Sequence, residues 1–550
     1  MYETQKDSFL SGLAVRFRWP LLLIGAALLG FTVIFPQLGF LQWIVLIPAM
    51  AVIFTRLTDN KVGFFRMYGM GFCFFAIYFS IAWHWFLWMY PLDYAGLSNL
   101  ASAAVVVLGS VGMGAFQATT AALIFPLFGL SCRSKYLSRT PILHPFLFAA
   151  LWVILEWFQA HSGWSGVPWG RLALGQANEV LMLQSASLFG SYFITFLLLT
   201  VNGLLTYALL YESRRTLSVL MAVSLVMSNL LFGLIYALIP AESDNTVKVA
   251  SIQGNLASGE EWGAIGSVDR ALDVYGELTR EAAAQGAKIV LWPETAIASN
   301  LRSVDDELID MATTYNVTIL AGVFTSAPDS AGDYNSVVAI LPDGSISESK
   351  YHKINLVPFG EFVPLRDLIS TIAPFLTEIN TLSDDFSFGE DAVVIPLEEA
   401  AVGSLICFDS IYEDNARASV KNGAELLAIP TNDSWFKDSR GVWMHSAQAQ
   451  LRAIETGRYV FRAANTGVSS VITDKGEVID CLGTFETGYV MAEVKPLQRT
   501  TLYTVIGNSF AYLCMAFAAG CVLFPVAEKI ISAASKRKKH DSEILKNIKF

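Results

Sequence analysis

Long apolar runs constrain the fold of this chain more than any other feature of the sequence. Eight of them have the length and hydropathy of membrane spans, and they lie near residues 20–35, 40–54, 62–88, 99–129, 145–160, 188–210, 217–239 and 505–527. The first two are short and are separated only by Pro36 to Gly39, so they could form a tight hairpin instead of two full spans. With 54% hydrophobic and 15% charged residues, the sequence predicts a polytopic α-helical membrane protein.

Basic residues predict how these spans are oriented. They gather in alternate loops, as Lys6, Arg16 and Arg18; Arg56, Lys61 and Arg66; Arg133, Lys135 and Arg139; Arg214 and Arg215; and seven residues after the last run. The intervening loops carry only Arg171. Because short cytoplasmic loops retain Lys and Arg, both termini are predicted in the cytoplasm and the segment between the seventh and eighth runs outside. No small-residue cleavage site follows the first run before the second begins, so we expect it to remain as an anchor.

Charge divides the chain into unlike parts. Residues 241–504 contain 38 Asp and Glu against 18 Lys and Arg, a balance of −20, while the remainder of the chain sums to +9. Such a segment is long and polar enough to form a soluble domain with its own core. We therefore predict a transmembrane domain at 1–240 with seven spans, an outer domain at 241–504, and a final transmembrane helix with a basic cytoplasmic tail at 505–550.

The outer domain alternates predicted strands and helices. Strands are predicted at 247–253, 288–292, 318–324, 337–341, 402–406, 426–430, 459–464 and 468–473, and helices at 268–285, 305–315, 413–422 and 442–456. This order is typical of an α/β fold in which helices cover the sheets. The domain has no glycine-rich phosphate loop and no dinucleotide motif, which argues against nucleotide chemistry and against a nucleic-acid partner.

Cys407 is the first candidate for chemistry. It ends the apolar strand at 402–406 and stands directly before Phe408, Asp409 and a segment with helical spacing. A thiol at such a turn lies beside free backbone N–H groups, which can hold a nucleophile and an oxyanion together. The alternative is a buried core cysteine, because free Cys is among the most buried residue types.

Three further polar residues stand at strand ends or in an unusually polar loop. Glu294 follows a strand in LWPET, while Lys353 and Glu361 share the loop KYHKINLVPFGEFVPL. Taken singly, each could be a solvated charge or a surface ion pair. Together with Cys407 they form a set in which Glu294 takes the thiol proton and Lys353 favours the thiolate and then steadies the oxyanion.

Histidine and disulfide alternatives fit the pattern less well. His445 or His352 could pair with Cys407, but neither segment offers an orienting partner, and we expect His445 on a helix surface or rim. Cys407 and Cys481 could form a disulfide in an oxidising compartment, although a core of this size does not need a lone bridge. Since no CxxC or His-rich cluster is present, we expect no metal or other cofactor.

The motifs around these residues are similar to those of a known family. WPET with Glu294, YHKINLVPFGEFVP with Lys353 and ICFDS with Cys407 resemble the Glu, Lys and Cys of the nitrilase (carbon-nitrogen hydrolase) superfamily. SIQGN at 251–255, NDSWF at 432–436 and RAIETGRYVFRAANTG at 452–467 resemble its membrane-bound apolipoprotein N-acyltransferase branch. The resemblance implies an α-β-β-α sandwich, an active-site role for Glu361, and a place for Trp262 on a mobile loop over the site.

The same resemblance implies a function. It is transfer of an acyl chain from a phospholipid, typically phosphatidylethanolamine, to the amine of a lipoprotein's diacylglyceryl-cysteine, by a monomer in the bacterial inner membrane with its catalytic domain in the periplasm. One departure is Asp409, since relatives usually carry Glu two places after the nucleophile; its shorter arm could orient Lys353 or the loop. The Trp- and Gly-rich segment at 161–187 could help to form a lipid entrance or could be an ordinary aromatic belt.

Two other classes of protein remain open. A membrane-tethered amidase would use the same residues but would admit water to the thioester. A receptor or transporter would use the outer domain only for binding, and a transporter needs ionisable residues inside its spans. Apart from His84 and Glu156 the apolar runs contain almost none, which disfavours transport.

Overall fold

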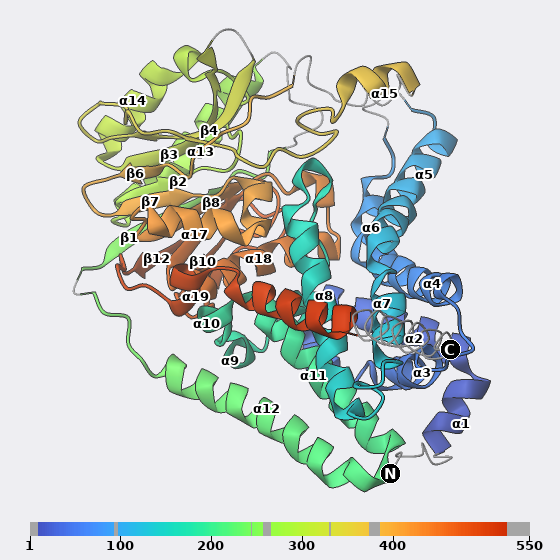
Figure 1. The fold of residues 1–550 in the computed structure, drawn as a ribbon. Coiled ribbons are helices and arrows are strands. Elements are labelled where there is room, and N and C mark those ends of the chain that lie inside the picture. Colours follow the sequence, from blue (N-terminus) through green and yellow to red (C-terminus); the bar gives the residue numbers. More distant parts are fainter. Residues whose placement is uncertain are drawn as a thin grey trace, which may run out of the picture.

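The computed structural model describes residues 9–92, 97–243, 245–256, 266–328, 332–372 and 385–524. Within these residues the chain forms a helical part, built mainly from the first half of the sequence, and an α/β part built from the second half (Figure 1). The two parts are joined by α12 on one side and by the helix that follows α19 on the other (Figure 1).

Six helical segments among the described residues are long and apolar enough to cross a membrane: Pro36–Leu57, Phe64–Ala82, Asn99–Cys132, Pro141–His161, Ser191–Leu210 and Glu212–Ala237. A seventh arises if α1 (Phe9–Arg16) and α2 (Arg18–Ile34), which meet at an angle of 94°, count as one span. After the α/β part, Ser509–Phe524 forms a shorter apolar helix. The chain is therefore a multi-pass membrane protein, and its helices follow the apolar runs of the sequence.

The helices are arranged around α11, the most buried span. Of its most apolar stretch, 78% is buried, against 22% for α12, which lies along the edge of the molecule (Figure 1). Besides α1 and α2, the α-helices of this part are α3 (Ile47–Val52), α4 (Phe64–Ala82), α5 (Asn99–Val107), α6 (Met113–Ala121), α7 (Ile124–Cys132), α8 (His144–His161), α9 (Val180–Leu183), α10 (Ala186–Phe189), α11 (Ser191–Leu210) and α12 (Arg215–Ala237).

The α/β part contains two six-stranded sheets. One has the strand order β12-β1-β2-β3-β4-β5, with β1 (Val247–Gln253), β2 (Ile289–Leu291), β3 (Thr318–Ser326), β4 (Asp333–Ile340), β5 (Tyr351–His352) and β12 (Gly488–Val494). The other has the order β11-β10-β9-β8-β7-β6, with β6 (Val394–Pro396), β7 (Ala401–Ser404), β8 (Leu426–Thr431), β9 (Tyr459–Ala464), β10 (Ser470–Ile472) and β11 (Val478–Cys481). Strands β1, β2 and β3 of the first sheet run parallel to one another. Strands β7, β8 and β9 of the second sheet do the same.

Helices cover the outer face of both sheets. The inner faces pack on each other, as Leu291 and Leu320 of one sheet share an apolar cluster with Ala428 and Phe461 of the other. The first sheet is covered by α13 (Ser267–Ala284) and α14 (Asp305–Tyr315), and the second by α17 (Glu413–Lys421) and α18 (Arg440–Thr456). This confirms the predicted α-β-β-α sandwich.

The α18 helix connects the sandwich to the membrane helices. Ala449 and Ala453 face the second sheet, while Met444 and Leu451 belong to the apolar core of the helical part. Both faces of α18 pack on protein, so the helix is buried along most of its length. The sandwich therefore lies directly on the ends of the spans.

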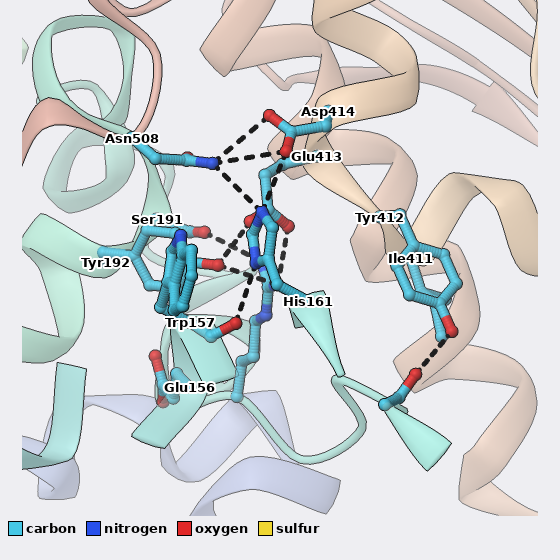
Figure 2. A network of polar contacts seen from close by, with 12 residues as sticks. Glu156, Trp157, His161, Ser191, Tyr192, Ile411, Tyr412, Glu413, Asp414 and Asn508 are labelled. Carbon is cyan, nitrogen blue, oxygen red and sulfur yellow. Dashed lines mark hydrogen bonds and ion pairs between the residues drawn. The ribbon is translucent and has the colours of Figure 1, made fainter. Parts of the chain in front are cut away.

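Polar contacts, some buried and some exposed, cross the same junction. Arg171 donates to Glu413 at 2.6 Å, and both side chains are 1% exposed. Tyr192 of α11 also donates to Glu413, and Asp414 binds His161 of α8 at 2.9 Å (Figure 2). The N-terminal turn of α17 is thus held by side chains of the helical part.

Candidate active site

Glu294 lies where β2 ends and the chain turns away from the sheet. The turn packs closely on β3, because a Cβ added at Gly322 would lie 2.1 Å from the carbonyl oxygen of Pro293. The Glu294 carboxylate accepts hydrogen bonds from Lys353 Nζ at 2.7 Å and from the backbone N–H of Asn432 at 2.9 Å. With 6% of its surface exposed, Glu294 is held by donors from both sheets.

Lys353 directly follows β5 and is 1% exposed. Its ammonium group donates to Glu294 at 2.7 Å and to Glu361 at 2.9 Å. Burial alone would lower the pKa of Lys353, but the two carboxylates outweigh it and raise the pKa well above its usual value. Lys353 is therefore a permanent, buried positive charge.

Cys407 begins a short helical turn, Cys407–Ile411, between β7 and α17. Its φ of +50° is unusual for a residue with a side chain and costs on the order of 1–2 kcal/mol. Burial, and then the charge of Glu294, raise the pKa of the thiol well above its usual value, while Lys353 opposes the rise. The resting group is therefore a thiol, which needs a base before it can attack a substrate.

Asp409 lies behind the loop that carries Lys353. Its carboxylate accepts from the backbone N–H of Asn355 at 2.7 Å and from the hydroxyl of Tyr351 at 2.8 Å. Burial raises its pKa to about 7, although Lys353 and these donors act in the opposite direction. The side chain of Asp409, though shorter than Glu, thus reaches the backbone directly after Lys353 and fixes the loop.

Comparisons with known proteins extend over both parts of the chain. The carbon-nitrogen hydrolase family model matches residues 248–502, and the model of the apolipoprotein N-acyltransferase N-terminal domain matches residues 21–204. A protein of Gloeobacter violaceus named apolipoprotein N-acyltransferase is 30% identical over 484 residues, which cover 87% of this chain and 88% of that protein. The chain belongs to the apolipoprotein N-acyltransferase family.

A second relative carries the same name as the first. A Vibrio cholerae protein of the same name is 30% identical over 441 residues, covering 78% of this chain and 82% of the relative. Among solved structures, a nitrilase-superfamily protein of Saccharomyces cerevisiae aligns with a TM-score of 0.37 and 18% identity over 46% of this chain and 92% of that protein. The sequence-based prediction of an apolipoprotein N-acyltransferase relative is confirmed.

Asn335 is a site residue that the sequence analysis missed. Its side-chain amide donates to Glu294 at 2.8 Å and to Glu361 at 3.0 Å, so it spans the two carboxylates beside Lys353. Glu361 is held further by the backbone N–H of Val357 at 2.8 Å. A signal exists in the sequence, because Asn335 is a polar residue at the head of the apolar run of β4, where it becomes buried.

The prediction for His445 was wrong. It is 2% exposed, and its Nδ1 lies 2.8 Å from Asp433, so the residue is buried and has the orienting partner that the sequence analysis could not find. Its Nε2 lies 3.1 Å from the carbonyl oxygen of Cys407. His352 turns elsewhere, since it stacks on Tyr334 and contacts Ser336 at 2.8 Å.

The segment at 161–187 is exposed at its start and buried further on. Trp164 is exposed, whereas residues 166–177 are buried and Trp169 stacks on Phe436 of the α/β part with ring centroids 5.6 Å apart. Tyr412 donates to the carbonyl of Gly166 at 2.7 Å. Residues 166–177 thus support the sandwich, and a lipid entrance formed by this segment stays a prediction.

The remaining predicted residues are placed as follows. Phe408 packs edge-on against Tyr412 and joins the apolar core of the helical part. Trp262 lies outside the described residues. Cys407 and Cys481 are free cysteines. The described residues contain no group of three or more His, Cys, Asp or Glu side chains that could hold a metal ion.

Proposed function

We propose that this chain transfers an acyl chain from a membrane phospholipid, typically phosphatidylethanolamine, to the N-terminal amine of the diacylglyceryl-cysteine of apolipoproteins. The shared name of its relatives supports a lipoprotein acceptor. The phospholipid donor is inferred from position: the sandwich lies on the ends of the membrane spans, so membrane lipid is the acyl source nearest to the site.

The observation that carries this proposal is the hydrogen-bonded pair of Glu294 and Lys353 beside a thiol with a raised pKa. Such a thiol requires a nearby base to remove its proton. Glu294 is a carboxylate close enough to the thiol to raise the pKa of Cys407. Lys353 can then stabilise the negative charge that develops on the substrate oxygen.

The first half of the proposed reaction forms a thioester. Glu294 takes the proton of the Cys407 thiol as the sulfur attacks the carbonyl carbon of the phospholipid ester. Lys353 and the backbone N–H of Phe408 stabilise the oxyanion. The ester C–O bond then breaks, and the leaving oxygen takes the proton from Glu294, which releases a lysophospholipid.

The second half passes the acyl group to nitrogen. The lipoprotein's amine attacks the thioester carbonyl, Glu294 accepts a proton from the amine, and the C–S bond breaks. The sulfur recovers its proton, so the net products are an amide and a lysophospholipid. Dividing the reaction in this way suits a site that two bulky lipid substrates enter in turn.

The same residues could in principle pass the acyl group to water, as in a membrane-tethered amidase or related hydrolase. The family membership favours an amine acceptor, and the fate of the thioester distinguishes the two reactions. In a hydrolase, water would release the labelled acyl chain as soon as the thioester forms.

We further propose that the catalytic domain spans 241–504 and lies on the periplasmic face of the inner membrane, with the transmembrane domain at 1–240 and the last helix and basic tail at 505–550. The charge distribution of the loops supports this orientation. We also propose that the protein works as a monomer.

The test is to incubate purified protein in micelles with phosphatidylethanolamine that carries a labelled acyl chain. We expect a labelled thioester on Cys407, no adduct in Cys407→Ala, and little adduct in Glu294→Gln, whose amide cannot accept the thiol proton. Undiminished labelling of Cys407→Ala would place the nucleophile elsewhere and refute the proposal.

A further inference from the structure

A second buried polar cluster lies beneath Cys407, and the proposed acyl transfer makes no direct use of it. Asp433 follows β8, His445 is on α18 and Arg462 is on β9, and their side chains are 1%, 2% and 0% exposed. Asp433 binds His445 Nδ1 at 2.8 Å through one oxygen and Arg462 at 2.8 Å through the other. A fully paired carboxylate in such a place fixes the orientation of the imidazole ring.

The contacts of His445 define the role of its Nε2. Nδ1 lies 2.8 Å from the carboxylate of Asp433 and 3.2 Å from the guanidinium of Arg462, so this end of the ring is fixed inside the cluster. On the other side, Nε2 lies 3.1 Å from the carbonyl oxygen of Cys407 and 3.2 Å from the hydroxyl of Ser410. That hydroxyl gives its own hydrogen to the same carbonyl at the shorter distance of 2.7 Å, so both neighbours of Nε2 present acceptors.

The carbonyl of Cys407 therefore receives two donors, from Ser410 and from His445. In a trans peptide the C=O and the following N–H point in opposite directions. Anchoring this carbonyl toward α18 consequently aims the N–H of Phe408 away from α18. The anchor also holds Cys407 in its strained left-handed conformation, which would otherwise relax.

The segment 431–433 connects this anchor to the rest of the site. Thr431 donates to Asp433 at 3.0 Å. Between them, the backbone N–H of Asn432 binds Glu294 at 2.9 Å. This short segment thus connects the base Glu294 to the His445 cluster.

We propose that His445 is a positioning residue that, through the carbonyl of Cys407, aims the N–H of Phe408 at the oxyanion formed during thioester formation. This inference rests on the proposed acyl transfer and adds a residue that the Cys, Glu and Lys set does not include. His445 acts on the direction of a backbone donor and does not touch the substrate.

Two substitutions separate the two ends of the imidazole. His445→Asn can keep a hydrogen bond to Asp433 but cannot reach the Cys407 carbonyl. His445→Gln places an N–H near the position of Nε2. Ser410 still anchors the carbonyl in both variants, which protects the turn from collapse. His144→Asn serves as the control, because His144 is also buried and also lies 3.1 Å from a backbone carbonyl, that of Leu137, in the helical part.

Two rates are measured on each variant: single-turnover acylation of Cys407 by labelled phosphatidylethanolamine in micelles, and alkylation of Cys407 by iodoacetamide. Alkylation forms no oxyanion, so it reports only on the thiol. We expect His445→Asn to lower acylation about 10-fold, less than the roughly 100-fold cost of losing a whole oxyanion donor because Ser410 still holds the carbonyl, with alkylation and the half-saturating lipid concentration nearly unchanged. His445→Gln should recover much of the loss, and His144→Asn should match the unsubstituted protein.

Two results would overturn the inference alone. One is a parallel fall of acylation and alkylation in His445→Asn, which indicates a general structural role. The other is equal acylation by the Asn and Gln variants, which removes any role for the Cys407 carbonyl contact. Failure of the unsubstituted protein to form an acyl-enzyme would instead overturn the proposed function, and the inference with it.

Discussion

Lys353 holds a positive charge between two carboxylates with almost no access to water, so its shape matters as much as its charge. Lys353→Arg keeps the charge but replaces a compact ammonium group with a broad planar fork. We predict a loss of acylation activity on the order of 100-fold or more, since the fork cannot occupy the same position against Glu294, Glu361 and the oxyanion.

The control for this variant is Lys350→Arg, three residues earlier at a partly exposed position, which should keep normal activity. Both variants are compared by the rate of Cys407 acylation at matched protein concentration. Near-normal turnover in Lys353→Arg would rule out a role in which Lys353 geometry stabilises the oxyanion.

Asp409 predicts the pH dependence. Its pKa of about 7 means that acidification through neutrality protonates the carboxylate and weakens its hold on Asn355 and Tyr351. We expect acylation to decline below about pH 7, and we expect Asp409→Asn to be slower and to lose this acid limb. An unchanged acid limb in Asp409→Asn would assign the titration to another group.

Protonation of Asp409 should lower the acylation rate but favour the folded state. The folded pKa of about 7 lies above the ordinary value of 3.8, so the folded state binds the proton more tightly than the unfolded state does. The stabilisation from this group is complete below about pH 4 and is lost as pH rises through 7. Thermal unfolding of Asp409→Asn should lack this component.

At the scale of elements, the docking of α17 on the membrane helices depends on the buried pair of Arg171 and Glu413. Burial would raise the pKa of Glu413, but Arg171 and then Arg452 lower it to about 2. Its contribution to stability is therefore present above about pH 4.5 and is lost as pH falls toward 2.

Removing one partner leaves the other charge buried without compensation. Glu413→Gln should destabilise the folded protein by about 3–5 kcal/mol, measured by chemical or thermal unfolding in detergent. The double variant Arg171→Met with Glu413→Leu should recover much of this loss, because it removes both charges. Equal destabilisation in the single and double variants would show that the charges are not coupled.

Much of the element order could be predicted from the sequence. The predicted strands at 247–253 and 459–464 and the helix at 305–315 match β1, β9 and α14 because each has a clear apolar period and a turn signal at its end. The strands β5, β6, β11 and β12 were not predicted. They are short or partly exposed, and β12 is placed by pairing with β1, so their strand character depends on partners distant in sequence.

The site was predictable to the same extent and for a related reason. The polar residues at strand ends, Glu294, Lys353 and Cys407, are visible in the sequence, and the sandwich brings the first two into direct contact. Asn335 and the cluster around His445 could not be found in this way. Asp433 is twelve residues before His445, and only the packing of α18 on the second sheet brings them together with Arg462.

At the scale of the whole molecule, α18 lies between the two parts and contributes side chains to an apolar cluster of each. The orientation prediction follows from the loop charges: both termini are cytoplasmic and 241–504 is periplasmic. Reporter fusions after Arg215 and after residue 244, at opposite ends of α12, should report opposite sides of the membrane. If both report the same side, α12 does not cross the membrane and the orientation is wrong.

The central claim is an ordered transfer through a thioester on Cys407, and a chase experiment tests it most directly. Protein labelled by phosphatidylethanolamine alone is freed of donor lipid and then given either buffer or a diacylated lipopeptide with a free amine. The account predicts that the label stays on Cys407 in buffer and moves rapidly to the lipopeptide as an amide. Rapid loss of the label to water, or transfer to the lipopeptide at full rate in Cys407→Ala, would contradict it.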